Sequence, residues 1–128
     1  MGNNHRTAVI ITVLFAALIG TYLDLIFVGK QMYAFPKRPF PDIFTINIAF
    51  TLIILPLCTF IFLEIVKNLR WPSTMVLIVF LGILISVTEH FTENWGLFVH
   101  GQAWHHFYSF LGYVLFMGWI YKIYRWFL

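Results

Sequence analysis

Five acidic residues and five histidines are the groups in this 128-residue chain that could exchange protons or bind a metal. Most of them gather late in the chain, at Glu89, His90, Glu93, His100, His105 and His106. Asp24 lies inside the first apolar run. An ionisable side chain at membrane depth is costly, so each of these residues is a candidate for function.

Three chemistries fit these residues. A carboxyl group in apolar surroundings can hold a proton at neutral pH, so Glu89 could protonate the alkene or epoxide of a lipid or isoprenoid, with Asp24 and Glu93 as further catalytic carboxyls. Aromatic residues, 20% of the chain, could stabilise the resulting carbocation. Proton relay by Asp24 and Glu89 would instead support transport. A single chain of this size is small for a transporter, so this role would require an oligomer.

The third chemistry is metal binding. His90 and Glu93 are spaced i, i+3, and His105 with His106 could complete a ligand set. No established metal or phosphate motif is present, so the sequence leaves the cofactor open.

Helical periodicity indicates how these groups could meet. At about 100° per residue, each apolar run carries one face of small or polar residues. The members are Thr21 and Asp24; Asn47, Thr51 and Cys58; Gly82, Ser86, Glu89 and Glu93; and His105, Ser109 and Gly112. Turned inward, these faces predict a pocket that includes Asn47, Ser86 and Ser109, with Cys58 as a buried thiol. The alternative is ordinary packing, for which membrane helices use the same residue types.

Composition predicts the surroundings of this pocket. The chain is 61% hydrophobic and 10% charged, whereas a soluble domain carries about a quarter charged residues. The bilayer is therefore the expected solvent, and disorder or nucleic-acid binding is excluded. We predict a single domain over residues 1–128, an all-α bundle of four transmembrane helices at about 8–28, 43–66, 75–90 and 107–124.

Charge and proline place the ends of these spans. In this topology, five Lys or Arg residues lie on the same side of the membrane as the N-terminus and three lie on the opposite side. Because positive charge favours the cytoplasmic side, this predicts cytoplasmic termini and a multi-pass protein of the plasma membrane. The first run is longer than a signal-peptide core, so we expect an uncleaved anchor. Prolines between residues 36 and 41 predict an extended outer loop. Asp42 and Ser73 are expected helix caps, and Pro56 predicts a kink.

Several segments resemble a family of uncharacterised small multi-pass membrane proteins of spore-forming Gram-positive bacteria. They are Thr21-Tyr22-Leu23-Asp24, the loop Tyr33 to Pro41, mid-helix Pro56, and Glu89-x3-Glu93-x2-Gly96-Leu97-Phe98 followed by Trp104-x3-Tyr108-Ser109-Phe110. The resemblance implies the same topology and gives special weight to Asp24, Pro36, Pro41, Glu89, Glu93, Trp104, Tyr108 and Ser109. It adds Trp104 and Tyr108 to the expected pocket, and it implies no activity.

A fainter resemblance is to lycopene-cyclase-type membrane domains, through Gly96-Leu97-Phe98-x2-Gly101 after a carboxylate. The Pro-x-Glu-Glu motif of those domains is missing here. The leading expectation is a binding or accessory subunit whose partners are the lipid bilayer and another membrane protein or a second copy. A lipid-modifying enzyme and a proton- or metal-linked transporter are the alternatives.

Overall fold

The computed structural model describes residues 2–101 and 106–128, with the backbone alone at residues 2, 3 and 106. Its elements are α1 (Gly2–Gly29), β1 (Tyr33–Ala34), the π-helical η1 (Phe50–Ile54), α2 (Leu55–Val66), α3 (Trp71–Asn94), β2 (Val99–His100) and α4 (His106–Phe127). The described chain is thus helical apart from two short strands and loops, and the all-α prediction is confirmed.

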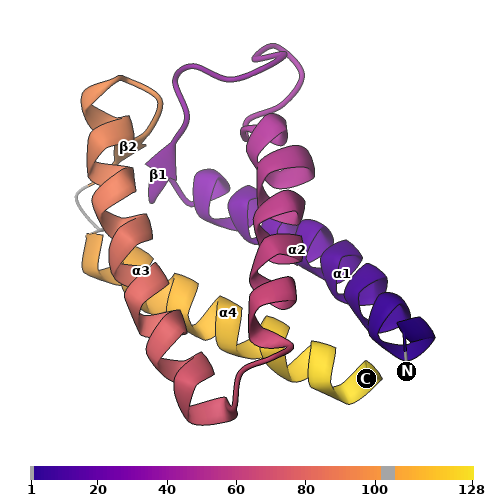
Figure 1. Ribbon diagram of the computed structural model, residues 1–128. Coiled ribbons are helices and arrows are strands. Elements are labelled where there is room, and N and C mark those ends of the chain that lie inside the picture. The colour runs from indigo at the N-terminus through magenta and orange to yellow at the C-terminus, as the bar shows by residue number, and fades with distance from the viewer. Residues whose placement is uncertain (1, 102–105) are drawn as a thin grey trace.

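The helices form two crossing layers (Figure 1). In that view α2 crosses over α1 and α3 crosses over α4, while α1 and α4 run side by side behind them. The packed helix pairs are α3–α4, α1–α2 and α1–α4. Because α2 and α3 are not a packed pair, the front layer is open between them.

The first turn of the second helical segment depends on Asn47. Its side-chain Oδ1 accepts a hydrogen bond from the Phe50 backbone N–H at 3.2 Å, which satisfies one donor that a helix start leaves unpaired. The expected start at residue 43 and the expected cap at Asp42 differ from the structure, where residues 41–43 form a turn, residues 45–46 a bend, and the helix begins at residue 48. The three prolines of the preceding loop disfavour helical backbone at and just before their positions, so the helix begins later in the chain.

Pro56 distorts the regular α-helix of the same segment, because proline has no N–H to donate to the backbone carbonyl four residues earlier. It lies in the first turn of α2, directly after the π-helical turns Phe50–Ile54. A proline removes one i→i−4 hydrogen bond and its ring presses on the preceding turn, and a π-helical turn relieves that crowding by widening the helix. The expected distortion therefore takes the form of a π-helical segment just before the proline.

Helix α3 is longer than predicted, because Pro72 starts it. Proline is favoured in the first helical turn, where its missing N–H would have had no partner. Arg70 is extended at the N-cap position and makes no side-chain cap, so Ser73 lies inside the helix instead of capping it. The C-terminal end extends to Asn94, and Gly96 then turns the chain with a φ of +79°.

The buried core lies where α1, α2 and α4 meet and between α3 and α4. Its fully buried members include Ala8, Leu63, Ile78, Ile120 and Tyr124. Small residues on α1 let the neighbouring helices approach closely, which is how membrane helices gain packing energy.

Most of the remaining apolar surface faces outward. Two helices, Asn4–Gly29 and Trp71–Asn94, are long and apolar enough to cross a membrane, and only 17% of the most apolar window of each is buried inside the protein. A third apolar helix, Phe50–Val66, is shorter. Large exposed side chains such as Leu14, Leu18, Val76 and Leu115 lie on the outer helix faces. Soluble monomers rarely expose so extensive an apolar surface.

Candidate functional site: an acidic apolar cavity

A cavity of about 320 Å³ lies at the end of the molecule that carries β1 and β2. Its walls come from α1, η1, α2, α3 and α4 and from the two loops that contain the strands. This volume is at the lower end of the range for small-molecule pockets, about 300–1,000 Å³. Most of the lining is aliphatic or aromatic, and the polar groups are few: Asp24, Tyr33, Asn47, Glu89, Thr92, Tyr108, Ser109 and Tyr113.

Asp24 supplies one carboxyl group to this wall. The Tyr33 hydroxyl donates a hydrogen bond to Asp24 Oδ1 at 2.6 Å. Asp24 Oδ2 is buried and has no hydrogen-bond partner among the described residues. A buried polar atom without a partner is costly, so Oδ2 is an open acceptor in the described part of the protein.

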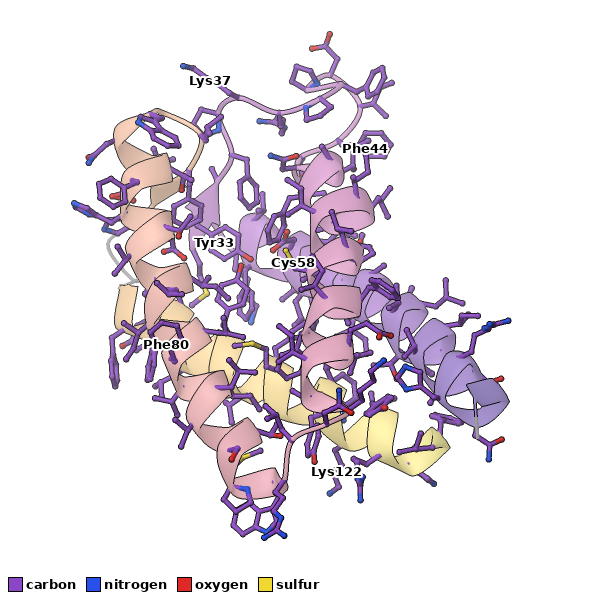
Figure 2. The ribbon with its side chains drawn as sticks, in the orientation of Figure 1. Tyr33, Lys37, Phe44, Cys58, Phe80 and Lys122 are labelled. Atoms are coloured by element: carbon purple, nitrogen blue, oxygen red, sulfur yellow. The ribbon has the colours of Figure 1, made fainter. Side chains whose placement is uncertain are left out.

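Tyr33 is held as a hydrogen-bond donor. Burial raises the pKa of its hydroxyl well above the usual range, and the negative charge of the Asp24 carboxyl raises that pKa further. The phenol therefore keeps its proton at any physiological pH and continues to donate to Asp24. Figure 2 shows Tyr33 between α2 and α3, within the open front of the molecule.

Glu89 supplies the second carboxyl group, from α3 on the other side of the cavity. Asn47 lies at the start of the second helical segment, and Tyr108 and Ser109 lie on α4. Ser109 is buried and Tyr108 is 44% exposed, so these two mark the interior and the rim of the cavity. Five of the residues proposed from sequence, Asp24, Asn47, Glu89, Tyr108 and Ser109, thus line one cavity.

Aromatic rings close the end of the cavity. Tyr33, Phe35 and Phe98 contact one another, with ring centroids 5.3–5.7 Å apart. The antiparallel pairing of β1 with β2 brings them together, since Tyr33 lies opposite His100 and Ala34 opposite Val99. Gly101 extends this contact by donating to the Met32 carbonyl, and a Cβ there would lie 2.8 Å from the Gln31 carbonyl oxygen. We call Tyr33, Phe35 and Phe98 the aromatic roof.

The proline-rich loop above the roof is organised by Arg38. Its guanidinium donates to the backbone carbonyls of Phe44, Phe35 and Pro41, at 2.6, 2.7 and 3.2 Å. Lys37 donates to the Trp95 carbonyl at 3.2 Å, which connects this loop to the end of α3. The two basic residues therefore fix a loop that its prolines already make stiff.

One side of the cavity has no packed wall. Ile54 and Leu55 line it on one side and Ile85 and Glu89 on the other, yet α2 and α3 do not form a packed pair. Ile54 is 48% exposed. Cys58, which we expected to be buried, is exposed on the side of α2 that faces α3 (Figure 2), because no helix packs there. The cavity therefore opens sideways between the front helices.

The remaining predicted site residues do not all reach the cavity. Glu93 is hydrogen-bonded to His100, from the end of α3 to β2, and His90 is exposed and contacts the Phe91 ring. Ser86 is half-buried on α3 and is not among the lining residues. Trp104 and His105 lie outside the described residues, as does the side chain of His106. Within the described residues no three His, Cys, Asp or Glu side chains form a metal-binding group, and the four-ligand set stays a prediction.

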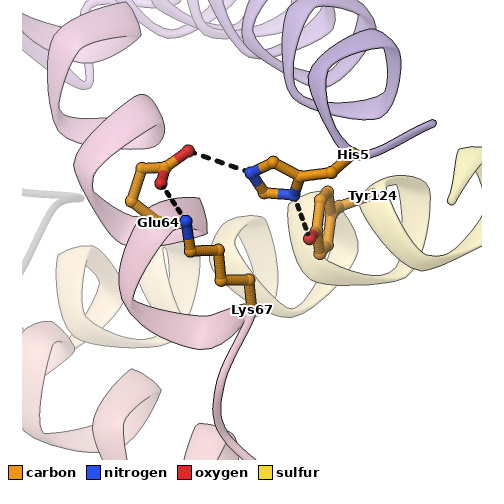
Figure 3. Close-up of polar contacts among 4 residues, drawn as sticks. All are labelled: His5, Glu64, Lys67 and Tyr124. Atoms are coloured by element: carbon orange, nitrogen blue, oxygen red, sulfur yellow. Dashed lines mark hydrogen bonds and ion pairs between the residues drawn. The ribbon is translucent and has the colours of Figure 1, made fainter. Parts of the chain in front are cut away.

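A second polar cluster, which the sequence analysis missed, lies at the opposite end of the molecule (Figure 3). His5 Nε2 lies 3.0 Å from Glu64 Oε1, and its Nδ1 lies 2.8 Å from the Tyr124 hydroxyl. Lys67 donates to Glu64 Oε2 at 2.7 Å, an i, i+3 contact between neighbouring turns. A carboxylate can only accept, so Nε2 carries a proton; in the neutral imidazole Nδ1 then accepts from the Tyr124 hydroxyl. The contacts join the start of α1 to the ends of α2 and α4.

Tyr33 is the other residue whose role the sequence analysis missed. A carboxyl group in an apolar run requires a donor, and Tyr33 is the nearest tyrosine after the end of α1. That requirement was the available signal, but only the fold shows that the chain reverses over its own helix.

In comparisons with known proteins, no family model, no curated protein and no solved structure matches this chain.

Proposed function

We propose that this chain is a multi-pass protein of the plasma membrane that crosses the bilayer four times and binds a small lipid-like molecule in the cavity. The observation that carries the proposal is the convergence of Asp24, Asn47, Glu89 and Ser109, from three helices and a helix start, on one mainly apolar cavity. Beside these polar groups the cavity encloses about 320 Å³, a volume within the range of pockets that hold small molecules.

The open side between α2 and α3 supports a ligand from the bilayer. In a membrane, this opening faces the hydrocarbon, and the aromatic roof and the Arg38-organised loop cover the end next to water. An apolar molecule could then pass into the cavity without crossing water. A binding role in a larger assembly, with another membrane protein or a second copy, is compatible with this proposal, since the outer helix faces stay apolar.

Two glycines on α4 allow a direct test. Gly112 lines the cavity, and a Cβ at that position would meet no atom within 4 Å, so Gly112→Leu adds a large side chain at the cavity wall without a clash at its Cβ. Gly118 also has room for a side chain but does not line the cavity, so Gly118→Leu is the matched control. The protein and both variants would be purified in mild detergent and their bound lipids identified by native mass spectrometry.

We expect the unaltered protein and Gly118→Leu to retain a bound lipid-like molecule in near-stoichiometric amount, and Gly112→Leu to lose at least about nine-tenths of it. Equal thermal unfolding of the two leucine variants would show that both fold. No bound molecule in the unaltered protein, or equal retention by both variants, would contradict the proposal.

A second candidate function is lipid or isoprenoid chemistry with Glu89 as the acid. It is favoured by the position of Glu89 on the wall of a mainly apolar, aromatic-lined cavity, opposite Asp24. Glu89→Gln retains the shape of the side chain and removes the acid. A catalytic Glu89 requires that this variant still binds the molecule found above but no longer converts it, whereas a binding protein retains the molecule unchanged in both forms.

A further inference from the structure

We infer that the molecule bound in the cavity carries a hydrogen-bond-donating, non-anionic head group, a hydroxyl or an ammonium, on an apolar body. This inference rests on the proposed function and names the chemical class of its ligand. The first observation is the character of the polar wall: Asp24 and Glu89 are both acids, and none of the described residues that line the cavity is Lys, Arg or His.

The head group must complete a bond that the protein leaves open. Asp24 Oδ1 already accepts from Tyr33, whereas Oδ2 is buried without a described partner. Asp24 is one of the residues that line the cavity, so a donor that binds beside it could reach this oxygen after a small shift of the carboxyl group. A hydroxyl or ammonium can donate to this oxygen. A carboxylate offers only acceptors at neutral pH, and a phosphate monoester, whose second pKa is about 6, offers mainly acceptors.

The walls around the acids also discriminate by charge. Either carboxyl group repels a further anion when it is ionised, and in any state an anionic head group would lose its water without gaining a cationic partner. The basic residues nearest in the outer loop do not line the cavity: Lys37 and Arg38 donate to backbone carbonyls. By contrast, the cavity is lined by aromatic residues such as Tyr33 and Phe98, a residue type that can interact favourably with a cation.

The apolar body fits the remainder of the cavity. Phe27, Phe50, Ile54, Ile85 and Phe116 line it, from α1, η1, α3 and α4. With the head group at Asp24, near the end of α1, the body extends along these side chains towards the open side between α2 and α3.

Four probes with the same dodecyl chain separate the head groups: dodecanol, dodecylammonium, dodecanoate and dodecyl phosphate. Their affinities for the full-length protein in lipid nanodiscs would be measured by competition against a fluorescent lipid analogue, with empty nanodiscs correcting for partition into lipid. We expect dodecanol, dodecylammonium or both to bind about 10-fold to 100-fold more tightly than dodecanoate and dodecyl phosphate, as a hydrogen bond to a charged group allows.

Asp24→Asn is the informative variant, because an amide can still accept from Tyr33 but lacks the acid. We expect it to reduce the preference for donors to less than about 3-fold while thermal unfolding stays close to that of the parent. Equal or tighter binding of dodecanoate or dodecyl phosphate would overturn this inference alone. Equal binding of all probes by Gly112→Leu and the parent would overturn the proposed function as well.

Discussion

At the scale of single residues, the hydrogen bond between Tyr33 and Asp24 can be tested by removing a single hydroxyl group. Tyr33 is 9% exposed and its hydroxyl lies 2.6 Å from Asp24 Oδ1. Removing the donor leaves both carboxyl oxygens without a described partner. The cost of an unsatisfied buried polar group, about 1–3 kcal/mol, therefore applies to this position.

We expect Tyr33→Phe to lower the free energy of unfolding by about 1–3 kcal/mol. Tyr22→Phe is the control, because Tyr22 lies on the same stretch of chain, is 64% exposed, and should tolerate the change within about 0.5 kcal/mol. Unfolding would be followed by intrinsic fluorescence in detergent under rising denaturant. Similar losses in the two variants would show that Asp24 does not depend on this donor.

At the scale of elements, the contact between α3 and α4 depends on a missing side chain. A Cβ on Gly82 would lie 2.7 Å from Val114 Cγ2 and 3.2 Å from two carbons of the Phe110 ring. The close approach of these helices sets the position of Glu89 on the cavity wall, two turns further along α3. Gly82 is thus a positioning residue for the wall.

Gly82→Leu should destabilise the protein by about 1–3 kcal/mol through overpacking. Gly118→Leu adds the same side chain where nothing lies within 4 Å of the new Cβ. Both variants gain the same helix propensity, so the difference between their stabilities measures the cost of overpacking at Gly82. Thermal unfolding of both variants in the same detergent measures this difference. If Gly82→Leu were the more stable of the two, the close α3–α4 contact would be contradicted.

The cluster of His5, Glu64, Lys67 and Tyr124 fixes the other end of the helices (Figure 3). Tyr124 is buried, with 2% exposed, so its hydroxyl depends on His5 for a partner. The Lys67–Glu64 pair is more exposed and contributes less, because solvent screens it.

We expect His5→Ala to lower the free energy of unfolding by about 1 kcal/mol, and the neighbouring exposed Arg6→Ala to change it by less than about 0.5 kcal/mol. A double-mutant cycle of His5→Ala with Tyr124→Phe should give a coupling of at least about 0.5 kcal/mol. Additive effects in that cycle would show that the two side chains act separately.

At the scale of the whole molecule, the proposed four crossings fix which loops share a side of the membrane. Asp42 lies in the proline-rich loop and Asn68 in the connection between α2 and α3, and both are exposed. Figure 1 places these segments at opposite ends of the molecule. A cysteine at either position can report its side once Cys58 is replaced.

In a Cys58→Ala background, Asp42→Cys should react with a membrane-impermeant maleimide on intact cells, and Asn68→Cys only after the membrane is opened. The reverse pattern would retain the crossing between the two loops and invert the orientation inferred from Lys and Arg. Reaction of both cysteines on intact cells would exclude a crossing between them and overturn the four-span proposal.

Several features could be predicted from the sequence because they follow from local chemistry. Apolar runs of sufficient length predict helices, and the observed α1 and α3 confirm two of them as long enough to cross a bilayer. Glu64 and Lys67 form an ion pair that depends on local sequence alone, since residues three apart are neighbours on a helix. Pro56 predicted a distortion, since it has no N–H to donate.

Other features depended on contacts between distant parts of the chain. Periodicity placed Asp24 and Glu89 on helix faces, but only the crossing of α1, α3 and α4 brings both to one cavity, and it excludes Glu93, which bonds to His100. Tyr33 reaches Asp24 where the chain turns back over α1, and the strand that carries it pairs with β2, 67 residues further along the chain (100 − 33). Cys58 is exposed because α2 and α3 do not pack, a fact about the whole fold. Local sequence determines which face of a helix is polar, whereas the tertiary arrangement decides what that face meets.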